Sequence, residues 1–589
     1  MLKFIFCFLF AHAGSCILGG KNEEVLEEID LESIVIVETR TPTPTRKKSP
    51  WVTRITDKEW EARQVSSVVD LLRTVPGLSV TRSGQVGSQS SLFSRGSNSD
   101  HTTFLFEGRK LNGGFSGTYN LGQIPLSGIS SLEVLRGSSS VQYGAAGIGG
   151  AVNLNSFKKN VGNSNFGFEI GSFNSIGIDV DAGFSNGGVA LSYSETDNDR
   201  PNANYENLSG SFSYDIELSE EWEFDLIGLG YQAQMGVPGS LTFSSLTDFQ
   251  DNENFLLSPR LSTSGDNWNW QSFYSRTQEQ VVTNWGTQIS NANQLETQLT
   301  FEPLDFFTIA LGANFQGDHF DDLGNGVDEK IKNFAQFGLF SFSLSEETDF
   351  TLGLRHEDYS TYGSKWTNTL FARHSISETN DLFFRYSSNF SPPTALDMFG
   401  WSGANPNLLP EESNSYEVGA HLRLNTVNVE LVLFQNNFEN MIEFYDPDND
   451  WVGEMKNLSQ AKTQGVEFSG DIPVSALWQG TFGYTYLETE DDKGQRLARR
   501  PRQSLSLGLL FQTVNRYVGV ELLEVQDRMD SATQRAEDYI VCRLYGMNEF
   551  FDGFQINYRL ENLLDKDYQE VIGYPALGFG AYGGLKYSF

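Results

Sequence analysis

The chain has 589 residues, of which 39% are hydrophobic and 13% aromatic, and its formal net charge is −35. This composition is too polar for a bundle of transmembrane helices and too aromatic for a disordered chain. The excess of acidic residues argues against a nucleic-acid partner, because surfaces that bind nucleic acids are basic.

Residues 1–20 have the pattern of a secretory signal peptide. Lys3 precedes an apolar run over residues 4–11, and Ala11-His12-Ala13 provides a small-x-small cleavage site. About ten apolar residues are too few to span a bilayer, which argues against a membrane anchor. We therefore expect an exported protein.

A short β-prone segment, residues 32–39 (ESIVIVET), precedes a Pro-rich, basic linker over residues 41–50. An extended segment on a flexible tether can add a strand to the sheet edge of another protein. The alternative is an ordinary N-terminal strand of an exported protein.

Residues 40–160 have the pattern of a small mixed α+β domain. Apolar residues at helical spacing predict a helix over 65–75, which Ser66 or Ser67 can cap and Pro76-Gly77 ends. Short apolar runs between glycine turns predict strands near residues 91–96, 104–108, 132–137 and 149–153. Arg95 and Arg136 each precede a glycine, and we expect them to pair with carboxylates of a surrounding wall, because an unpaired buried charge is costly.

From residue 161 to residue 589, apolar and polar residues alternate, which predicts strands with one apolar face. A soluble sandwich or propeller could use the same pattern. The signal peptide, the aromatic strand ends and the alternation of short turns with long polar loops favour a membrane barrel. At about 9–11 residues per crossing plus connections, this length suits about 22 antiparallel strands, and a barrel of that width needs a plug.

Five stretches of the chain resemble the TonB-dependent outer-membrane receptors. Residues 67–80, 90–112 and 129–154 are similar to the plug domain of that family, and residues 391–412 and 561–568 are similar to its barrel. The resemblance implies an all-β transmembrane barrel in the outer membrane, with the α+β domain 40–160 as a plug inside the lumen of the barrel 161–589. It also implies a monomer that is surrounded by lipid and lipopolysaccharide, imports a scarce large ligand and catalyses no reaction.

The same resemblance identifies residues 32–39 as a TonB box, the segment that the periplasmic protein TonB binds to deliver energy. Its residues are Glu32, Ser33, Ile34, Val35, Ile36, Val37, Glu38 and Thr39.

Within the family, the run at 90–112 and the modest loops look most similar to the cobalamin (vitamin B12) receptors. A ferric siderophore or heme receptor is the alternative, and a passive porin is a remote one, because porin barrels have 16–18 strands and no plug of this kind. The resemblance places ligand contacts at Gln89, Ser91, Asn98, Phe115, Ser116 and Arg499. Neutral hydrogen-bonding groups and an aromatic ring suit a large amphipathic ligand, although polar loop tips are the simpler interpretation.

Two details of this set are specific. Gln89 stands where the cobalamin receptor has an apolar residue, and we expect Asn98, which follows a sharp turn, to display its amide at a loop tip. Arg499 belongs to an arginine cluster that could instead bind lipopolysaccharide phosphates or neutralise the acidic residues 488–492.

Two acidic loops suggest calcium as a structural ion. Aspartate oxygens are ligands that Ca²⁺ prefers, and the family's cobalamin receptor orders its loops with calcium in this region. The candidate ligands are Asp197, Asp199, Asp248 and Asp251, and a solvated charged loop is the alternative. No zinc-ligand spacing and no GxSxG element occurs, so we expect no catalytic metal, no other catalytic cofactor and no catalytic site.

Overall fold

The computed structural model describes residues 34–41, 43–44, 47–111, 114–156, 164–401, 403–445, 453–457, 460–531 and 533–589. The predicted signal peptide, residues 1–20, and the first two box residues, Glu32 and Ser33, lie outside the described residues. All described residues belong to the compact unit that begins at Ile34. None of the helices described here combines the length and the hydropathy needed to cross a bilayer.

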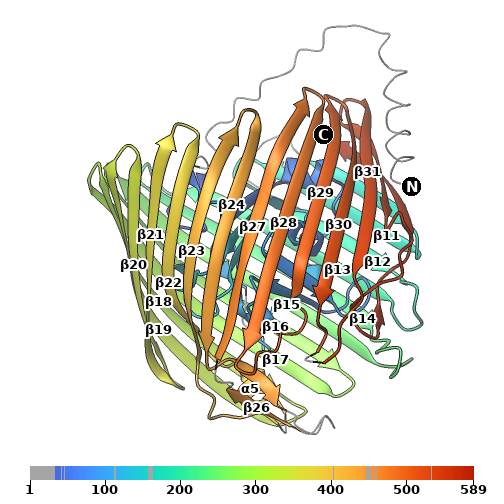
Figure 1. Ribbon diagram of the computed structural model, residues 1–589, viewed down its shortest axis with the longest axis horizontal. Helices are drawn as coiled ribbons and strands as arrows, with labels where there is room; N and C mark the ends of the chain where they lie inside the picture. Colours follow the sequence, from blue (N-terminus) through green and yellow to red (C-terminus); the bar gives the residue numbers. More distant parts are fainter. Residues whose placement is uncertain are drawn as a thin grey trace. The chain divides into compact units, whose positions relative to one another are not determined.

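Twenty-two antiparallel strands of the described chain close into a barrel (Figure 1), as the length of residues 161–589 predicts. Each strand pairs with the next along the chain, and the ring closes where Phe168 of the first strand lies opposite Leu585 of the last. The strands are β10 (Asn165–Gly171), β11 (Ser175–Phe184), β12 (Gly187–Thr196), β13 (Tyr205–Glu217), β14 (Trp222–Gly236), β15 (Phe249–Gly265), β16 (Trp268–Thr283), β17 (Gly286–Leu304), β18 (Phe307–Asp322), β19 (Val327–Ser345), β20 (Thr348–Tyr359), β21 (Gly363–Ser377), β22 (Asn380–Ser391), β23 (Glu411–Leu424), β24 (Val427–Glu439), β27 (Gln460–Ser475), β28 (Trp478–Asp491), β29 (Pro501–Thr513), β30 (Arg516–Arg528), β31 (Tyr539–Phe551), β32 (Phe554–Glu561) and β35 (Gly580–Ser588).

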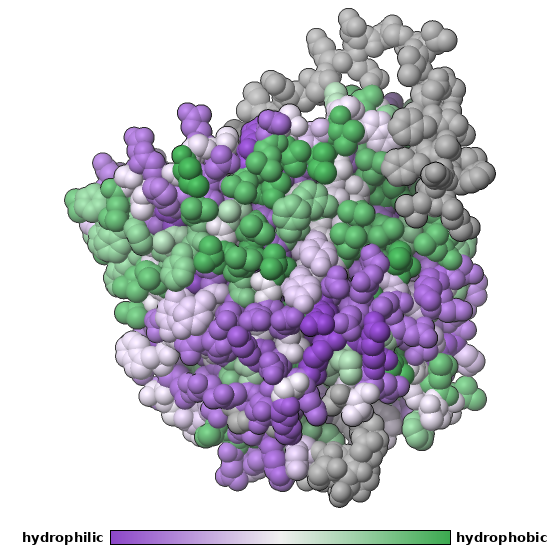
Figure 2. Space-filling view, in the orientation of Figure 1, coloured by the Kyte–Doolittle hydropathy of each residue, from purple (hydrophilic) through white to green (hydrophobic). Residues whose placement is uncertain are grey.

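The alternating pattern places apolar side chains on the outer face of the barrel and polar ones in the lumen. Ile176, Ile178 and Val180 of β11 are exposed on the outer face, whereas Ser209 and Ser211 of β13 are buried on the face toward the plug. In Figure 2 the apolar residues gather in a band across the upper half of the visible face, and hydrophilic residues cover much of the lower half. A barrel that is apolar outside and polar inside is built for a bilayer.

The connections differ between the two ends of the barrel. The end at which β35 finishes has short turns, such as residues 218–221, and we call it the inner end. The opposite end, which contains α5 (Ala395–Phe399) and lies at the bottom of Figure 1, carries the long connections 392–410 and 562–579. Short turns on the periplasmic side and long loops outside are the usual arrangement of outer-membrane barrels. The long loops also contain two small hairpins, β25 (Ile442–Tyr445) with β26 (Glu454–Asn457) and β33 (Gln569–Val571) with β34 (Tyr574–Pro575).

The plug is built around a five-stranded sheet in the order β3-β8-β9-β6-β7, in which β6 and β9 are parallel. A separate hairpin joins β4 to β5, and short helical turns connect the strands. The elements are β3 (Val52–Thr56), α2 (Asp57–Ala62), α3 (Val68–Leu72), β4 (Leu78–Arg82), β5 (Ser90–Ser94), η2 (Ser99–His101), β6 (Thr102–Phe106), β7 (Arg109–Lys110), η3 (Leu121–Gln123), β8 (Ile129–Arg136), α4 (Ser140–Tyr143) and β9 (Gly150–Ser156).

The helix predicted over 65–75 is shorter in the structure, where it forms α3. Ser67 is its N-cap and accepts a hydrogen bond from Asp70 N, so the helix cannot begin earlier. The short helix α2 was not predicted, although Thr56 and Glu59 form a capping box that marks its start.

The apolar core of the plug continues into one side of the barrel wall. Val69, Leu72 and Phe104 of the plug belong to the same buried cluster as Leu229 and Tyr231 of β14. The plug therefore packs against this side of the wall by apolar contact, and smaller apolar clusters join it to other strands, as where Trp51 packs with Phe383 and Val432.

Candidate functional site

Arg95 and Arg136 of the plug form ion pairs with the barrel wall, as predicted. Arg95 donates from Nε and Nη2 to the carboxylate of Glu467 at 2.5 and 3.0 Å, and from Nη1 to Glu417 at 2.7 Å. Arg136 Nη1 shares Glu467 at 2.7 Å, and Arg385 Nη2 of the wall closes the network on Glu417 at 2.6 Å.

These five side chains are almost completely buried, so the interaction of each depends on the others. Burial alone would lower the pKa of Arg95, but Glu467 and then Glu417 outweigh it and raise that pKa above its ordinary value. Arg95 therefore stays charged, and the network ties the centre of the plug to β23 and β27.

Other arginines fasten the plug to distant parts of the wall. Arg109 Nη2 lies 2.9 Å from Asp225 of β14, and Arg63 Nε lies 2.7 Å from Glu521 of β30. Arg73 Nη1 lies 2.7 Å from Glu570 in the hairpin β33-β34. Several separate contacts must therefore break before the whole plug can leave the lumen.

The described part of the predicted TonB box is folded back on the protein at the inner end. The strand β1 (Ile34–Val35) pairs with β2 (Thr43–Pro44). The backbone N–H groups of Ile36 and Val37 donate to Glu133 Oε2 of β8, at 3.2 and 3.0 Å. The hydrogen-bonding edge that would accept a partner strand is thus partly occupied.

The residues after this edge are anchored by their side chains. The carboxylate of Glu38 accepts from Trp51 Nε1 at 2.8 Å and from the hydroxyl of Ser49. Thr39 follows in a turn, and Arg40 then forms an ion pair with Glu296 of β17. Ile36 differs from the buried Val37 and Glu38 that follow it, because it is 42% exposed.

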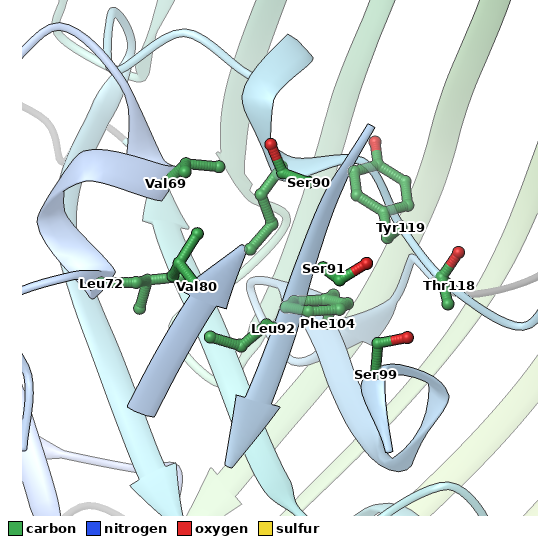
Figure 3. Close-up of a pocket in the computed structure, with 11 residues that line it drawn as sticks. Val69, Leu72, Val80, Ser90, Ser91, Leu92, Ser99, Phe104, Thr118 and Tyr119 are labelled. Atoms are coloured by element: carbon green, nitrogen blue, oxygen red, sulfur yellow. The ribbon is translucent and has the colours of Figure 1, made fainter. Parts of the chain in front are cut away.

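The predicted ligand residues lie on the outer side of the plug in different environments. Gln89 is exposed, and Ser116 is half-buried with its hydroxyl 2.8 Å from Thr118 Oγ1. Phe115 is buried and makes an edge contact with Phe320 of β18, with ring centroids 5.8 Å apart. Ser91 lines a gap of about 10 Å³ in the plug core (Figure 3), which is the size of about one water molecule and too small for a ligand.

The expectation that Asn98 displays a free amide is wrong. Asn98 is half-buried, and its Oδ1 accepts a hydrogen bond from Arg500 Nη2 at 2.5 Å. Arg500 also donates to the carbonyls of Gly96 and Ser97, at 3.3 and 3.1 Å, and its guanidinium lies 4.4 Å from the ring centroid of Phe93. A barrel residue therefore positions this loop of the plug.

Sequence reasoning singled out Arg499 and missed the role of its neighbour. Arg499 lies at the rim with Nε 3.7 Å from Asp530 Oδ1, while Arg500 is buried and reaches the plug. The only signal was the motif ARRPR, in which neighbouring arginines must point in different directions.

The second contact at this place joins His101 to the wall. His101 Nε2 lies 2.5 Å from Glu411 Oε2 of β23, and its ring stacks on Phe438 with centroids 6.3 Å apart. Together with Arg500, this pair fixes the residues around Asn98 from two sides.

The four aspartates predicted to bind calcium do not form a preassembled cage. Asp199 Oδ1 accepts from Gln85 of the plug, and Asp197 Oδ2 accepts from Asn174 at 2.7 Å. Among the described residues, the groups of three acidic or histidine side chains with ligand atoms within 4.8 Å of one another are Asp100-His101-Glu411 and His319-Asp321-Asp328. Asp248 and Asp251 belong to neither, so calcium binding stays a prediction that requires the loops to rearrange.

Comparison with protein families gives two matches that agree with this division of the chain. The model described as "TonB dependent receptor-like, beta-barrel" matches residues 137–563, and the model of the TonB-dependent Receptor Plug Domain matches residues 45–151.

Curated relatives match over almost the whole chain at low identity. The vitamin B12 transporter BtuB of Photobacterium profundum is 22% identical, with 96% of both chains covered. The vitamin B12 transporter BtuB of Vibrio vulnificus is 25% identical, with 87% of this chain and 88% of the relative covered.

Solved structures share the fold. The siderophore receptor PirA from Acinetobacter baumannii is similar with a TM-score of 0.76 and 18% identity, over 92% of this chain and 98% of that one. A point mutant of the ferric enterobactin receptor PfeA from Pseudomonas aeruginosa, in complex with enterobactin, gives a TM-score of 0.78 and 16% identity, over 92% of this chain and 100% of that one.

Proposed function

Because this chain belongs to the TonB-dependent receptor family of outer-membrane proteins, we propose that it takes up cobalamin (vitamin B12) with energy delivered through TonB. The observation that carries the choice of ligand is the neutral chemistry of the predicted plug contacts: Gln89 has an exposed amide, and Asn98 and Ser116 carry amide and hydroxyl groups that already have partners within the protein. The names of the curated relatives support the same ligand.

The two arginines near this surface face acceptors of the protein itself. Arg500 donates to the plug loop, and Arg499 Nε lies 3.7 Å from Asp530 Oδ1, an ion pair longer than a hydrogen bond. An anionic iron chelate is recognised best by arginines with free donors, whereas the amide-fringed rim of a corrinoid is matched by groups that both donate and accept. This contrast favours cobalamin over a ferric siderophore.

The coupling step would use the box at the inner end. An outer membrane has no energy source of its own, and strand addition to residues 34–37 gives TonB a handle on the plug. That edge becomes available when the N–H groups of Ile36 and Val37 leave Glu133.

Uptake of radiolabelled cyanocobalamin tests the proposal in cells whose own cobalamin receptor has been deleted, with and without TonB. We expect uptake only with TonB, and we expect Val35→Pro to abolish it while surface binding persists, because proline removes a backbone donor and blocks strand addition. Val35→Ile, which keeps that donor, is the matched control. Surface binding of a ferric siderophore or of heme in place of cyanocobalamin would overturn the choice of ligand, and normal uptake by Val35→Pro would remove the box assignment.

A further inference from the structure

A second cavity, of about 110 Å³, lies between the plug and the barrel wall near the outer end. It is about ten times larger than the gap of Figure 3 and has room for several water molecules. The plug contributes Asp100, Lys110 and the small residues Gly114, Gly117, Ala145 and Ala146, and the wall contributes residues of β18 to β20 and of the following turn. Residues 391–395, which lead into α5, also line it.

Two hydrogen-bond donors in this cavity have capacity to spare. The hydroxyl of Tyr362 is buried and makes no hydrogen bond of good geometry within the described chain, although it interacts with the hydroxyl of Tyr359. Lys110 Nζ donates to the carbonyl of Ala145 at 3.2 Å, and no described carboxylate oxygen lies within 4.0 Å of it. An ammonium has three N–H donors, so Lys110 can donate again.

Acceptors face the same space. Both carboxylate oxygens of Asp318 accept from Gln316 Nε2 at 3.0 Å, and each retains a free lone pair. Asp100 adds a second carboxylate from the plug. Much of the remaining surface is apolar or aromatic, since Phe320 and Ile331 line it and the ring of Tyr359 stacks on Tyr362 with centroids 4.7 Å apart.

This mixture selects among the possible occupants. An anionic group would gain Lys110 but would face Asp318 and Asp100, and a cationic group would face Lys110 in a space of low dielectric constant. A primary carboxamide is neutral, donates from its nitrogen and accepts at its oxygen, so it satisfies both kinds of group without a charge penalty.

We propose that this cavity binds a primary carboxamide arm of the ligand. The proposal rests on the proposed function, because the corrin rim of cobalamin carries such arms. In this arrangement the carboxamide oxygen accepts from Lys110 and Tyr362, and its nitrogen donates to Asp318. The adjacent loop places the arm next to a predicted contact, since Phe115 lies between Gly114 and Gly117 and packs on Phe320.

Binding isotherms on the purified full-length barrel test this with two probes. One is cyanocobalamin, and the other is the set of its monocarboxylic acids, in which a single side-chain amide has become a carboxylate. We expect at least one acid to bind about tenfold more weakly than cyanocobalamin. We expect Tyr362→Phe and Asp318→Asn each to weaken cyanocobalamin binding about 3- to 10-fold, the range of one net hydrogen bond. Asp318→Asn should also reduce the discrimination against that acid.

The control is Tyr386→Phe, which removes a hydroxyl that donates to Asn414 away from the cavity and should leave both affinities unchanged. Heat-modifiable migration verifies assembly, and Lys110→Met gives a plug-side variant should a wall variant fail to assemble. Cyanocobalamin binding that is identical in wild type and in the cavity variants would overturn the cavity proposal while the proposed function stands. Absence of cyanocobalamin binding by the wild type would overturn both.

Discussion

Arg500, a buried residue of the barrel, donates a hydrogen bond from Nη2 to Oδ1 of Asn98 on the plug, across 2.5 Å. The same guanidinium holds the carbonyls of Gly96 and Ser97. A predicted ligand contact and a contact between plug and barrel therefore share one residue, Asn98.

The first prediction concerns this arginine. Arg500→Met keeps much of the side-chain volume over Phe93 but removes three hydrogen bonds to the plug loop. We expect cyanocobalamin affinity to fall about 10-fold or more, because the loop loses its fixed position, while the barrel still assembles. Arg496→Met, in the same connection but paired with Asp527 at the rim, is the control and should bind normally. Equal affinities for the two variants would contradict the positioning role of Arg500.

The second prediction concerns the buried ion-pair network. Glu467→Gln removes the charge that Arg95 and Arg136 share, and breaking a buried pair in this way typically costs about 3–5 kcal/mol. We expect faster hydrogen exchange in the plug strands β5 and β8 and a lower urea midpoint for loss of plug structure. Glu488→Gln breaks the pair with Arg502, in which both side chains are about 40% exposed, and should change little. Unchanged protection of β5 and β8 in Glu467→Gln would rule out a stabilising role for the network.

The third prediction concerns pH at the outer end. Burial, and next the carboxylate of Asp100, raise the pKa of Asp397 in α5 to about 6. Thr394 donates from its backbone and its hydroxyl to Asp397. These hydrogen bonds and the nearby His101 lower the pKa of Asp397, but they only partly offset the increase. Because the ordinary pKa is about 3.9, the folded state binds the proton more tightly, so local stability is highest below about pH 4 and falls as the pH rises to about 6.

Hydrogen exchange of residues 394–400, corrected for the intrinsic rate, measures this effect. We expect protection to decrease between about pH 4 and about pH 6.5 in the wild type. Asp397→Asn keeps the capping oxygen and cannot titrate, so its profile should be flat. If protection in the wild type does not change with pH, the protonation of Asp397 does not control the stability of this segment.

The fourth prediction concerns calcium, which the geometry leaves open. If Asp197, Asp199, Asp248 and Asp251 rearrange into a site, millimolar Ca²⁺ should strengthen ligand binding and EDTA should weaken it. The double substitution Asp197→Asn with Asp248→Asn should remove that dependence while keeping the side-chain shapes. If the ligand affinity of the wild type does not depend on calcium, the calcium site is wrong, and the role of Asp199 is its contact with Gln85 of the plug.

The barrel was predictable because the period-two pattern is local and repeats in every strand. The charges on Arg95 and Arg136 predicted ion pairs with the wall, but the partners Glu417 and Glu467 are 322 and 372 residues away from Arg95, and no local pattern connects them. The environment of Asn98 was predicted wrongly for the same reason. A turn predicts an exposed side chain only when no residue from a distant part of the chain contacts that side chain, and Arg500 contacts Asn98. The carboxamide cavity lies between segments that are close only after the barrel closes around the plug.

The folded-back box has a consequence for competition between proteins. Ile36 and Val37 already donate to Glu133, so a partner that adds a strand there must displace an intramolecular acceptor first. Its apparent affinity is reduced by the fraction of molecules in which the segment is free. When many copies of such a protein compete for a limited amount of the partner, the copies whose segment is folded back bind little of it. The partner then remains available to the copies whose segment has been released.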